Sequence, residues 1–271
     1  MPWDGGEVYV ADVILNEDND NSLSIKNEIH VAGVRGKISA GYPSWSNNDT
    51  VVFTLDESGY VNPWKYTVNG KASALFPEPI SKDFGPPLWV LSNSPYALID
   101  KKGELALFCA TTDGRDVLYL VDLNGGSPPK LIKSPFVGID VIRTVSRERE
   151  EVVFKGQKTD DRATILRCSL SSLRNEEEFV VLKGAPAVIV DGEPLPRNVI
   201  SLPQPMTLKV PPDDSPLPVI YYPPYNPRYS GSSIGGEKPP CIVNIHGGPT
   251  GLEKQGLNWL TQYFTSRGWA W

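Results

Sequence analysis

The residues best suited to chemistry form the loop His246-Gly247-Gly248-Pro249-Thr250. Two adjacent glycines remove both Cβ atoms, so backbone N–H groups can approach a negatively charged oxygen closely. The chemistry that such a loop can perform is stabilisation of an oxyanion. A tight turn without catalytic function is the alternative for a Gly-Gly pair taken alone.

The elements on both sides of this loop favour the functional interpretation. Pro239 and Pro240 mark the entry to a mostly β-branched run, Cys241–Ile245, which predicts a buried and parallel strand. After the loop, apolar residues recur at helical spacing at Leu257, Leu260, Tyr263 and Phe264. Gly268 then suits the position that follows a helix C-terminus, and residues 269–271 read as the start of another strand. The pattern predicts a strand–loop–helix–strand unit.

The block EKPPCIVNIHGGPT, followed by QYFTSRGWA, resembles the start of the catalytic domain of S9 (prolyl oligopeptidase family) serine peptidases. The resemblance is strongest to the acylaminoacyl-peptidase and dipeptidyl-peptidase-like branch. It implies an α/β-hydrolase domain in which the Gly248 N–H helps to hold the tetrahedral oxyanion, since Pro249 has no N–H. His246, Gly247 and Pro249 complete that loop. It also implies a peptide substrate, a covalent acyl-enzyme, and no metal or organic cofactor.

The catalytic triad implied by this resemblance is not expected within the chain. The nearest candidate for the nucleophile motif G-x-S-x-G is Gly231–Gly235, which lies on a Pro/Ser/Gly-rich loop with no strand before it. We interpret it as a linker. The two histidines, His30 and His246, have no evident partner serine. The 271-residue chain alone is therefore expected to be inactive, with the Ser–Asp–His triad lying beyond it.

Composition excludes several other classes of protein. The net charge of −6 argues against nucleic acid as the main partner. No apolar run approaches the ~20 residues of a membrane span, and the N-terminus lacks the order of a signal peptide. Cys109, Cys168 and Cys241 are widely spaced and are expected to be buried free thiols. These features favour a cytoplasmic protein. If the N-terminus is truncated, an organelle such as the chloroplast is the alternative location.

A repeated pattern organises the first two thirds of the chain. Phe53, Phe108 and Phe154 end similar apolar runs and lie 55 and 46 residues apart. Two further strand-like segments follow each run, which is typical of β-propeller blades. The strands between Val8 and Val31 are expected to belong to a preceding blade. An ordinary β-sandwich is the alternative, and it requires the spacing to be a coincidence.

The predicted fold is mainly β. Residues 1–198 form a partial β-propeller of about three and a half blades, and residues 199–271 form the N-terminal edge of an α/β-hydrolase domain. A propeller needs roughly 4–8 blades to close, so the chain is expected to be part of a longer protein. The resemblance implies that this protein is a peptidase that cleaves short peptides near the N-terminus of the peptide. Homo-oligomerisation is possible. The alternative function is a non-catalytic propeller that binds peptides or proteins.

Overall fold

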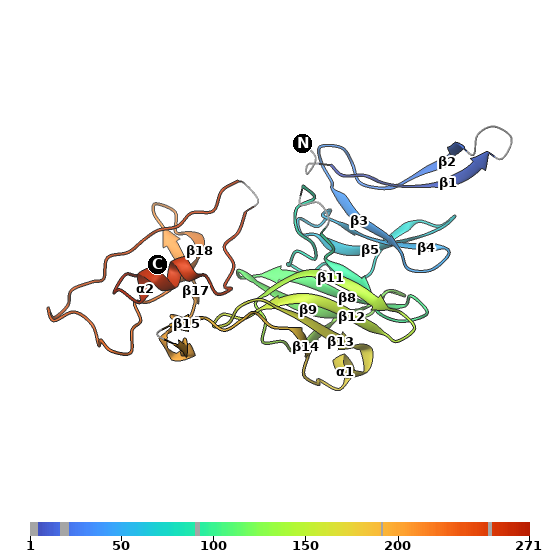
Figure 1. The fold of residues 1–271 in the computed structure, drawn as a ribbon. Helices are drawn as coiled ribbons and strands as arrows, with labels where there is room; N and C mark the ends of the chain where they lie inside the picture. The colour runs from blue at the N-terminus through green and yellow to red at the C-terminus, as the bar shows by residue number, and fades with distance from the viewer. Residues whose placement is uncertain (1–4, 17–21, 90–92, 191, 249–250) are drawn as a thin grey trace.

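Three four-stranded antiparallel sheets make up most of the computed structural model, which describes residues 5–16, 22–89, 93–190, 192–248 and 251–271 (Figure 1). In each sheet the four strands follow one another along the chain, as in a meander. The first sheet contains β3 (Ala40–Trp45), β4 (Thr50–Leu55), β5 (Asn62–Thr67) and β6 (Ala72–Ala74). The second contains β7 (Tyr96–Leu98), β8 (Leu105–Thr112), β9 (Arg115–Asp122) and β10 (Lys130–Ile132). The third contains β11 (Gly138–Ser146), β12 (Glu151–Gln157), β13 (Thr164–Ser169) and β14 (Val180–Lys183), with the short helix α1 (Leu170–Arg174) between its last two strands.

The three repeated phenylalanines occupy equivalent places in these sheets. Phe53, Phe108 and Phe154 each lie on the second strand of their sheet, at 0%, 0% and 1% exposure. Each pairs across the ladder with a large apolar residue of the third strand, respectively Trp64, Tyr119 and Leu166. The predicted mainly-β fold built from repeated antiparallel units is therefore confirmed.

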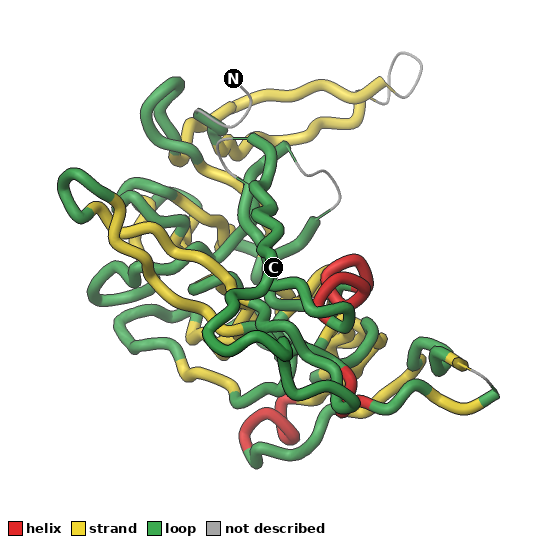
Figure 2. The backbone as a smooth tube through the Cα atoms, turned by 90° about the vertical axis from the view of Figure 1, so that its left-hand side faces the viewer, coloured by secondary structure: helices red, strands yellow, loops and turns green. Residues whose placement is uncertain are grey.

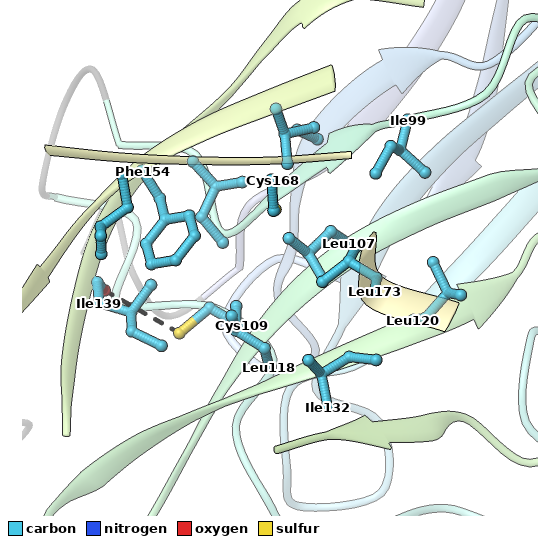
Figure 3. Packing of buried hydrophobic residues seen from close by; sticks show 14 of the residues in the cluster. Ile99, Leu107, Cys109, Leu118, Leu120, Ile132, Ile139, Phe154, Cys168 and Leu173 are labelled. Atoms are coloured by element: carbon cyan, nitrogen blue, oxygen red, sulfur yellow. Dashed lines mark hydrogen bonds between the residues drawn. The ribbon is translucent and has the colours of Figure 1, made fainter. Parts of the chain in front are cut away.

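The sheets stack through cores that use both faces of a strand. Side chains alternate between the two faces, so Val51 and Phe53 join one apolar cluster whereas Val52 joins the next. In the second sheet Phe108 likewise faces the first sheet, and Leu107 and Cys109 face the third. Figure 3 shows the cluster between the second and third sheets. The middle sheet is thus buried on both faces, which explains its nearly continuous apolar strands.

Polar contacts also hold neighbouring sheets together. The Tyr96 hydroxyl lies 2.9 Å from the carbonyl oxygen of Val52 and donates to the first sheet. The Thr144 hydroxyl donates to the Leu98 carbonyl at 2.7 Å, and the Arg147 side chain donates to the Asp100 carbonyl at 2.9 Å. Because each bond joins a side chain in or beside one sheet to a backbone carbonyl in or beside the preceding sheet, these bonds help to fix how one sheet sits on the next.

A long hairpin precedes the first sheet. Strands β1 (Val8–Asn16) and β2 (Ser22–Ala32) pair only with each other among the described residues, and they project at the top of Figure 2. The base of the hairpin packs on the first sheet through Val8 and Ala32. Toward the tip Val13 and Ile25 are 67% and 70% exposed. The assignment of this hairpin to a preceding blade stays a prediction.

The C-terminal part forms a separate group of elements, at the left of Figure 1. The connection from the third sheet contains β15 (Ile189–Val190), β16 (Glu193–Pro194) and the 3₁₀ helix Arg197–Val199, where the predicted domain boundary falls. The antiparallel pair β17 (Gln204–Val210) and β18 (Ser215–Tyr221) follows, and α2 (Trp259–Thr265) packs nearby. No helix in the described part of the chain is long and apolar enough to cross a bilayer.

The thiols do not all behave as predicted. Cys109 and Cys168 are buried, and the Cys109 Sγ lies 3.9 Å from the carbonyl oxygen of Ile139 (Figure 3). Cys241 is exposed, so the prediction of three buried thiols is wrong for this residue. The two buried cysteines lie on strands between packed sheets, whereas the segment that carries Cys241 has no layer over it among the described residues.

Candidate functional site

The segment before the candidate oxyanion loop is not the predicted buried strand. Cys241 forms a single parallel bridge with Ala270, and the Ile242 N–H donates to the Ala270 carbonyl at 2.9 Å. Val243 and Ile245 are 77% and 82% exposed. The parallel direction was predicted correctly and the burial was not, because burial requires a neighbouring layer that the described residues do not supply.

The loop itself presents backbone to solvent. His246, Gly247 and Gly248 are exposed, and Gly248 has a φ of +74°, in the left-handed region that favours glycine. A Cβ added at Gly247 or Gly248 would meet no atom within 4 Å. Within the described residues the Gly248 N–H donates to no backbone carbonyl. Pro249 lies outside the described residues. The role of Gly248 as an oxyanion donor stays a prediction.

Helix α2 follows the loop with the caps that its sequence predicts. The Asn258 side chain accepts from the Leu260 N–H at 2.9 Å and caps the N-terminus. At the other end Gly268 has a φ of +88°, and the Trp269 N–H donates to the Phe264 carbonyl at 3.2 Å. This six-to-one bond is that of a Schellman motif, so the predicted position of Gly268 after the helix is confirmed.

The polar side of α2 is the side that packs. Thr261 and Gln262 are buried, whereas Leu260 and Tyr263 are 57% and 53% exposed. The Gln262 amide accepts from the N–H of Ser201 at 2.8 Å and donates to its carbonyl at 3.0 Å. This two-way contact ties the helix to the start of the C-terminal part. The apolar side of α2 therefore lies open to solvent.

The two histidines and the candidate nucleophile serine do not form a triad. His30 lies on the exposed hairpin, where its ring packs on Tyr9 with centroids 5.0 Å apart. By its letters the segment Gly231–Gly235 does match G-x-S-x-G, with Ser233 at the centre. The structure places it in an exposed loop without a preceding strand, where the Ser232 hydroxyl bonds to Glu237. A nucleophile elbow needs a strand-to-helix turn, so the linker interpretation agrees with this context.

A polar anchor that the sequence did not suggest joins the segment after the loop to the sheets. Lys254 Nζ lies 2.8 Å from Oδ2 of Asp116, whose side chain is 1% exposed, and 3.9 Å from Oδ1 of Asp140. Burial by itself lowers the pKa of Lys254, but Asp116, Asp140 and Cys109 together raise this pKa above its ordinary value. The partners lie 138 residues apart in sequence, so no local pattern could have predicted the pair.

Comparisons with known proteins show which solved structures this chain resembles. No protein-family model and no curated protein matches the chain. Among solved structures, a puromycin-hydrolysing peptidase of Mycobacterium tuberculosis is 27% identical with a TM-score of 0.80, and the match covers 100% of this chain and 38% of that one. A puromycin hydrolase is 22% identical with a TM-score of 0.80, covering 100% of this chain and 37% of the other. Oligopeptidase B from Trypanosoma brucei is 13% identical with a TM-score of 0.58, covering 97% and 34%.

This chain thus spans little more than a third of the length of the structures that it matches. All three are peptidases of the S9 family. The resemblance to that family predicted from the HGGP block is confirmed, and the more distant of these matches show the fold alone.

Proposed function

We propose that this chain is the junction between the β-propeller and the catalytic domain of an S9-type serine peptidase. The proposed division is residues 1–198 and 199–271. The observation that carries the proposal is the match to the puromycin-hydrolysing peptidase, which covers the sheets and the loop segment together at 27% identity. The Ser–Asp–His triad would be supplied by residues outside the printed sequence.

In this proposal Gly248 helps to stabilise the transition state. A serine hydroxyl attacks the peptide carbonyl, and the negative charge that develops on its oxygen is held by backbone N–H groups. The Gly248 N–H is one of these donors. Its exposure and its lack of a backbone acceptor in the described part of the chain support this role. Departure of the amine leaves an acyl-enzyme, which water then hydrolyses.

The proposed substrates are short peptides cleaved near the N-terminus. Two of the structural relatives are named for the hydrolysis of puromycin. Puromycin contains an amino acid in amide linkage, and cleavage of that amide would release a single aminoacyl group. A stacked-sheet domain beside the active site would admit short peptides more readily than folded proteins. Free and acylated N-termini are both compatible with these observations.

The test begins with the endogenous protein. An antibody against the loop at residues 224–237 should detect a product well above the 29.8 kDa of this chain, and a fluorophosphonate probe should label that product. The isolated chain should remain unlabelled. A single unlabelled band near 29.8 kDa would instead favour the propeller as a peptide- or protein-binding module.

Substrate class and the role of the loop are tested on the labelled product. Aminoacyl and N-acetyl-aminoacyl p-nitroanilides separate an aminopeptidase from an acylaminoacyl-peptidase. Gly248→Ala should reduce kcat more than Gly247→Ala, because only Gly248 has a positive φ while both have open space for a methyl group. Equal effects of the two substitutions would argue against a special role for the backbone at Gly248.

A further inference from the structure

We propose that Lys254 and Asp116 are positioning residues, whose ion pair holds the loop His246–Gly248 in place by fastening the following segment to the stacked sheets. The inference deepens the proposed function and rests on it for its catalytic consequence. The ion pair itself is a property of this chain and can be tested independently.

Asp116 is a rigid point of attachment. Its Oδ1 accepts from the Thr111 hydroxyl at 2.8 Å, and its Oδ2 accepts from the Ile139 N–H at 2.8 Å. Thr111 belongs to the second sheet and Ile139 to the third, so the carboxylate is fixed where the two sheets meet. Lys254 supplies the cation that balances this buried charge. A buried carboxylate without such a partner is strongly unfavourable.

Three hydrogen bonds on the C-terminal side of Lys254 fix the direction of the segment. The Gln255 N–H donates to the Gly114 carbonyl at 2.9 Å, and its side-chain amide donates to the Asp113 carbonyl at 2.7 Å. The Gln157 amide donates to the Leu257 carbonyl at 2.9 Å. The segment therefore contacts the second sheet first and the third sheet next.

Close approaches at three glycines show how tightly this segment fits. A Cβ added at Gly114 would lie 2.7 Å from Ile220 Cδ1 and 2.9 Å from the Glu253 carbonyl oxygen, and one added at Gly256 would lie 2.6 Å from the Gln157 side chain. Neither contact leaves room for a side chain. The third glycine, Gly251, makes its contacts with the candidate loop.

Of two contacts on the N-terminal side of Lys254, one is made to the segment just before the candidate loop and the other to the loop itself. The Asn244 amide donates to a Glu253 carboxylate oxygen at 2.7 Å. A Cβ added at Gly251 would lie 2.8 Å from Nδ1 of His246 and would overlap the carbonyl oxygen of Gly247. The loop thus rests against the same segment that Lys254 fastens.

Removing the lysine charge should do more than remove one bond. Asp140 lies 3.9 Å from Lys254, so the ammonium group is shared by two carboxylates. A neutral side chain at this position leaves Asp116 and Asp140, which both lie on the sheets, without their shared cation. Release of the segment then lets water solvate the two carboxylates, so the loss of the charge favours release. Arginine keeps the charge and should keep the segment in place.

The first measurement is made on the chain printed here, in dilute solution, with Lys254→Met, Lys254→Arg and Lys155→Met. Lys155→Met is the matched control because it removes a different lysine from Asp140, an exposed pair at 3.3 Å. Selective glycine and histidine labelling allows the nuclear Overhauser effect between Gly251 Hα and the His246 ring to be followed. We expect Lys254→Met to abolish it and the other two variants to retain it. Retention in Lys254→Met would overturn the inference.

The second measurement is made on the longer product if it hydrolyses p-nitroanilides. Loss of one oxyanion-hole donor costs about 10²–10³ in kcat, so a displaced loop should lower kcat by about 100- to 1000-fold and change KM by less than about threefold. Lys254→Arg should restore most of the loss. An unchanged kcat in Lys254→Met would refute the catalytic consequence. A wild-type product without activity would refute the proposed function, whereas the hold on the loop would still be decided by the first measurement.

Discussion

Alkylation of the three cysteines tests the fold quantitatively, because one thiol is exposed and two are buried between sheets. Burial raises the pKa of Cys168 to about 12. At pH 8 only about 10⁻⁴ of such a thiol is ionised, about 1000-fold less than for a thiol with the ordinary value of 9.0. The more basic thiolate is about 20-fold more nucleophilic, so ionisation alone slows Cys168 by about 50-fold.

Cys109 should react more slowly still. Burial raises its thiol pKa well above the ordinary value, and the nearby carboxylates of Asp116 and Asp140 add to that effect. The packed side chains around both buried thiols also exclude the reagent, which multiplies the ionisation effect. Cys241 is exposed, and among the described residues its segment has a single bridge partner, so packed side chains do not exclude the reagent from it.

The assay is iodoacetamide labelling at pH 8 with timed quenching, digestion and mass spectrometry. We expect Cys241 to be modified at least about 50-fold faster than Cys168 in the folded protein, and all three cysteines to react alike in denaturant. Comparable native rates for Cys168 and Cys241 would show that the core between the second and third sheets is not packed as described. Protection of Cys241 at all dilutions would refute the open arrangement of residues 241–245.

Three further predictions concern packing and charge. Phe154→Ala removes a side chain at 1% exposure and should lower the free energy of unfolding by about 3–5 kcal/mol. Leu131→Ala, at 57% exposure, should lower it by less than about 0.5 kcal/mol. Urea unfolding of both variants, followed by near-UV circular dichroism, measures the difference. Leu260→Lys should reduce self-association in sedimentation velocity because this residue is 57% exposed, while Thr261→Lys, at 3% exposure, should unfold α2 and increase self-association. Lys254→Met should lower stability by about 1–3 kcal/mol, a range reduced because its side chain is 41% exposed. The pKa of Lys254 is raised in the folded protein, so the difference in stability between the wild type and Lys254→Met should be fully present below the ordinary pKa of 10.5. The difference should disappear as the pH rises through the pKa of Lys254 in the folded protein. Unfolding measurements at alkaline pH test this.

The local patterns of this sequence were sufficient for the type and order of most elements. Alternating apolar residues specify a strand whichever sheet it joins, so the equivalent positions of Phe53, Phe108 and Phe154 could be predicted from spacing. Asn258 and Gly268 likewise define the ends of α2 through contacts made within a few residues. The HGGP block likewise indicated the resemblance to S9 peptidases from a run of a few neighbouring residues.

Which residues are buried, and which distant residues pair, could not be predicted from local sequence patterns. Cys168 and Cys241 occupy similar apolar runs, and only the presence or absence of a packed layer separates a protected thiol from an exposed one. The letters around Ser233 match a nucleophile motif, yet the motif functions only on a strand-to-helix turn that this loop does not form. Lys254 and Asp116 are ordinary charged residues in sequence, and stacking of the second and third sheets is what makes Asp116 a buried anion that Lys254 can reach. Local preferences act between neighbours along the chain, whereas desolvation and charge pairing depend on which distant segments the fold brings together.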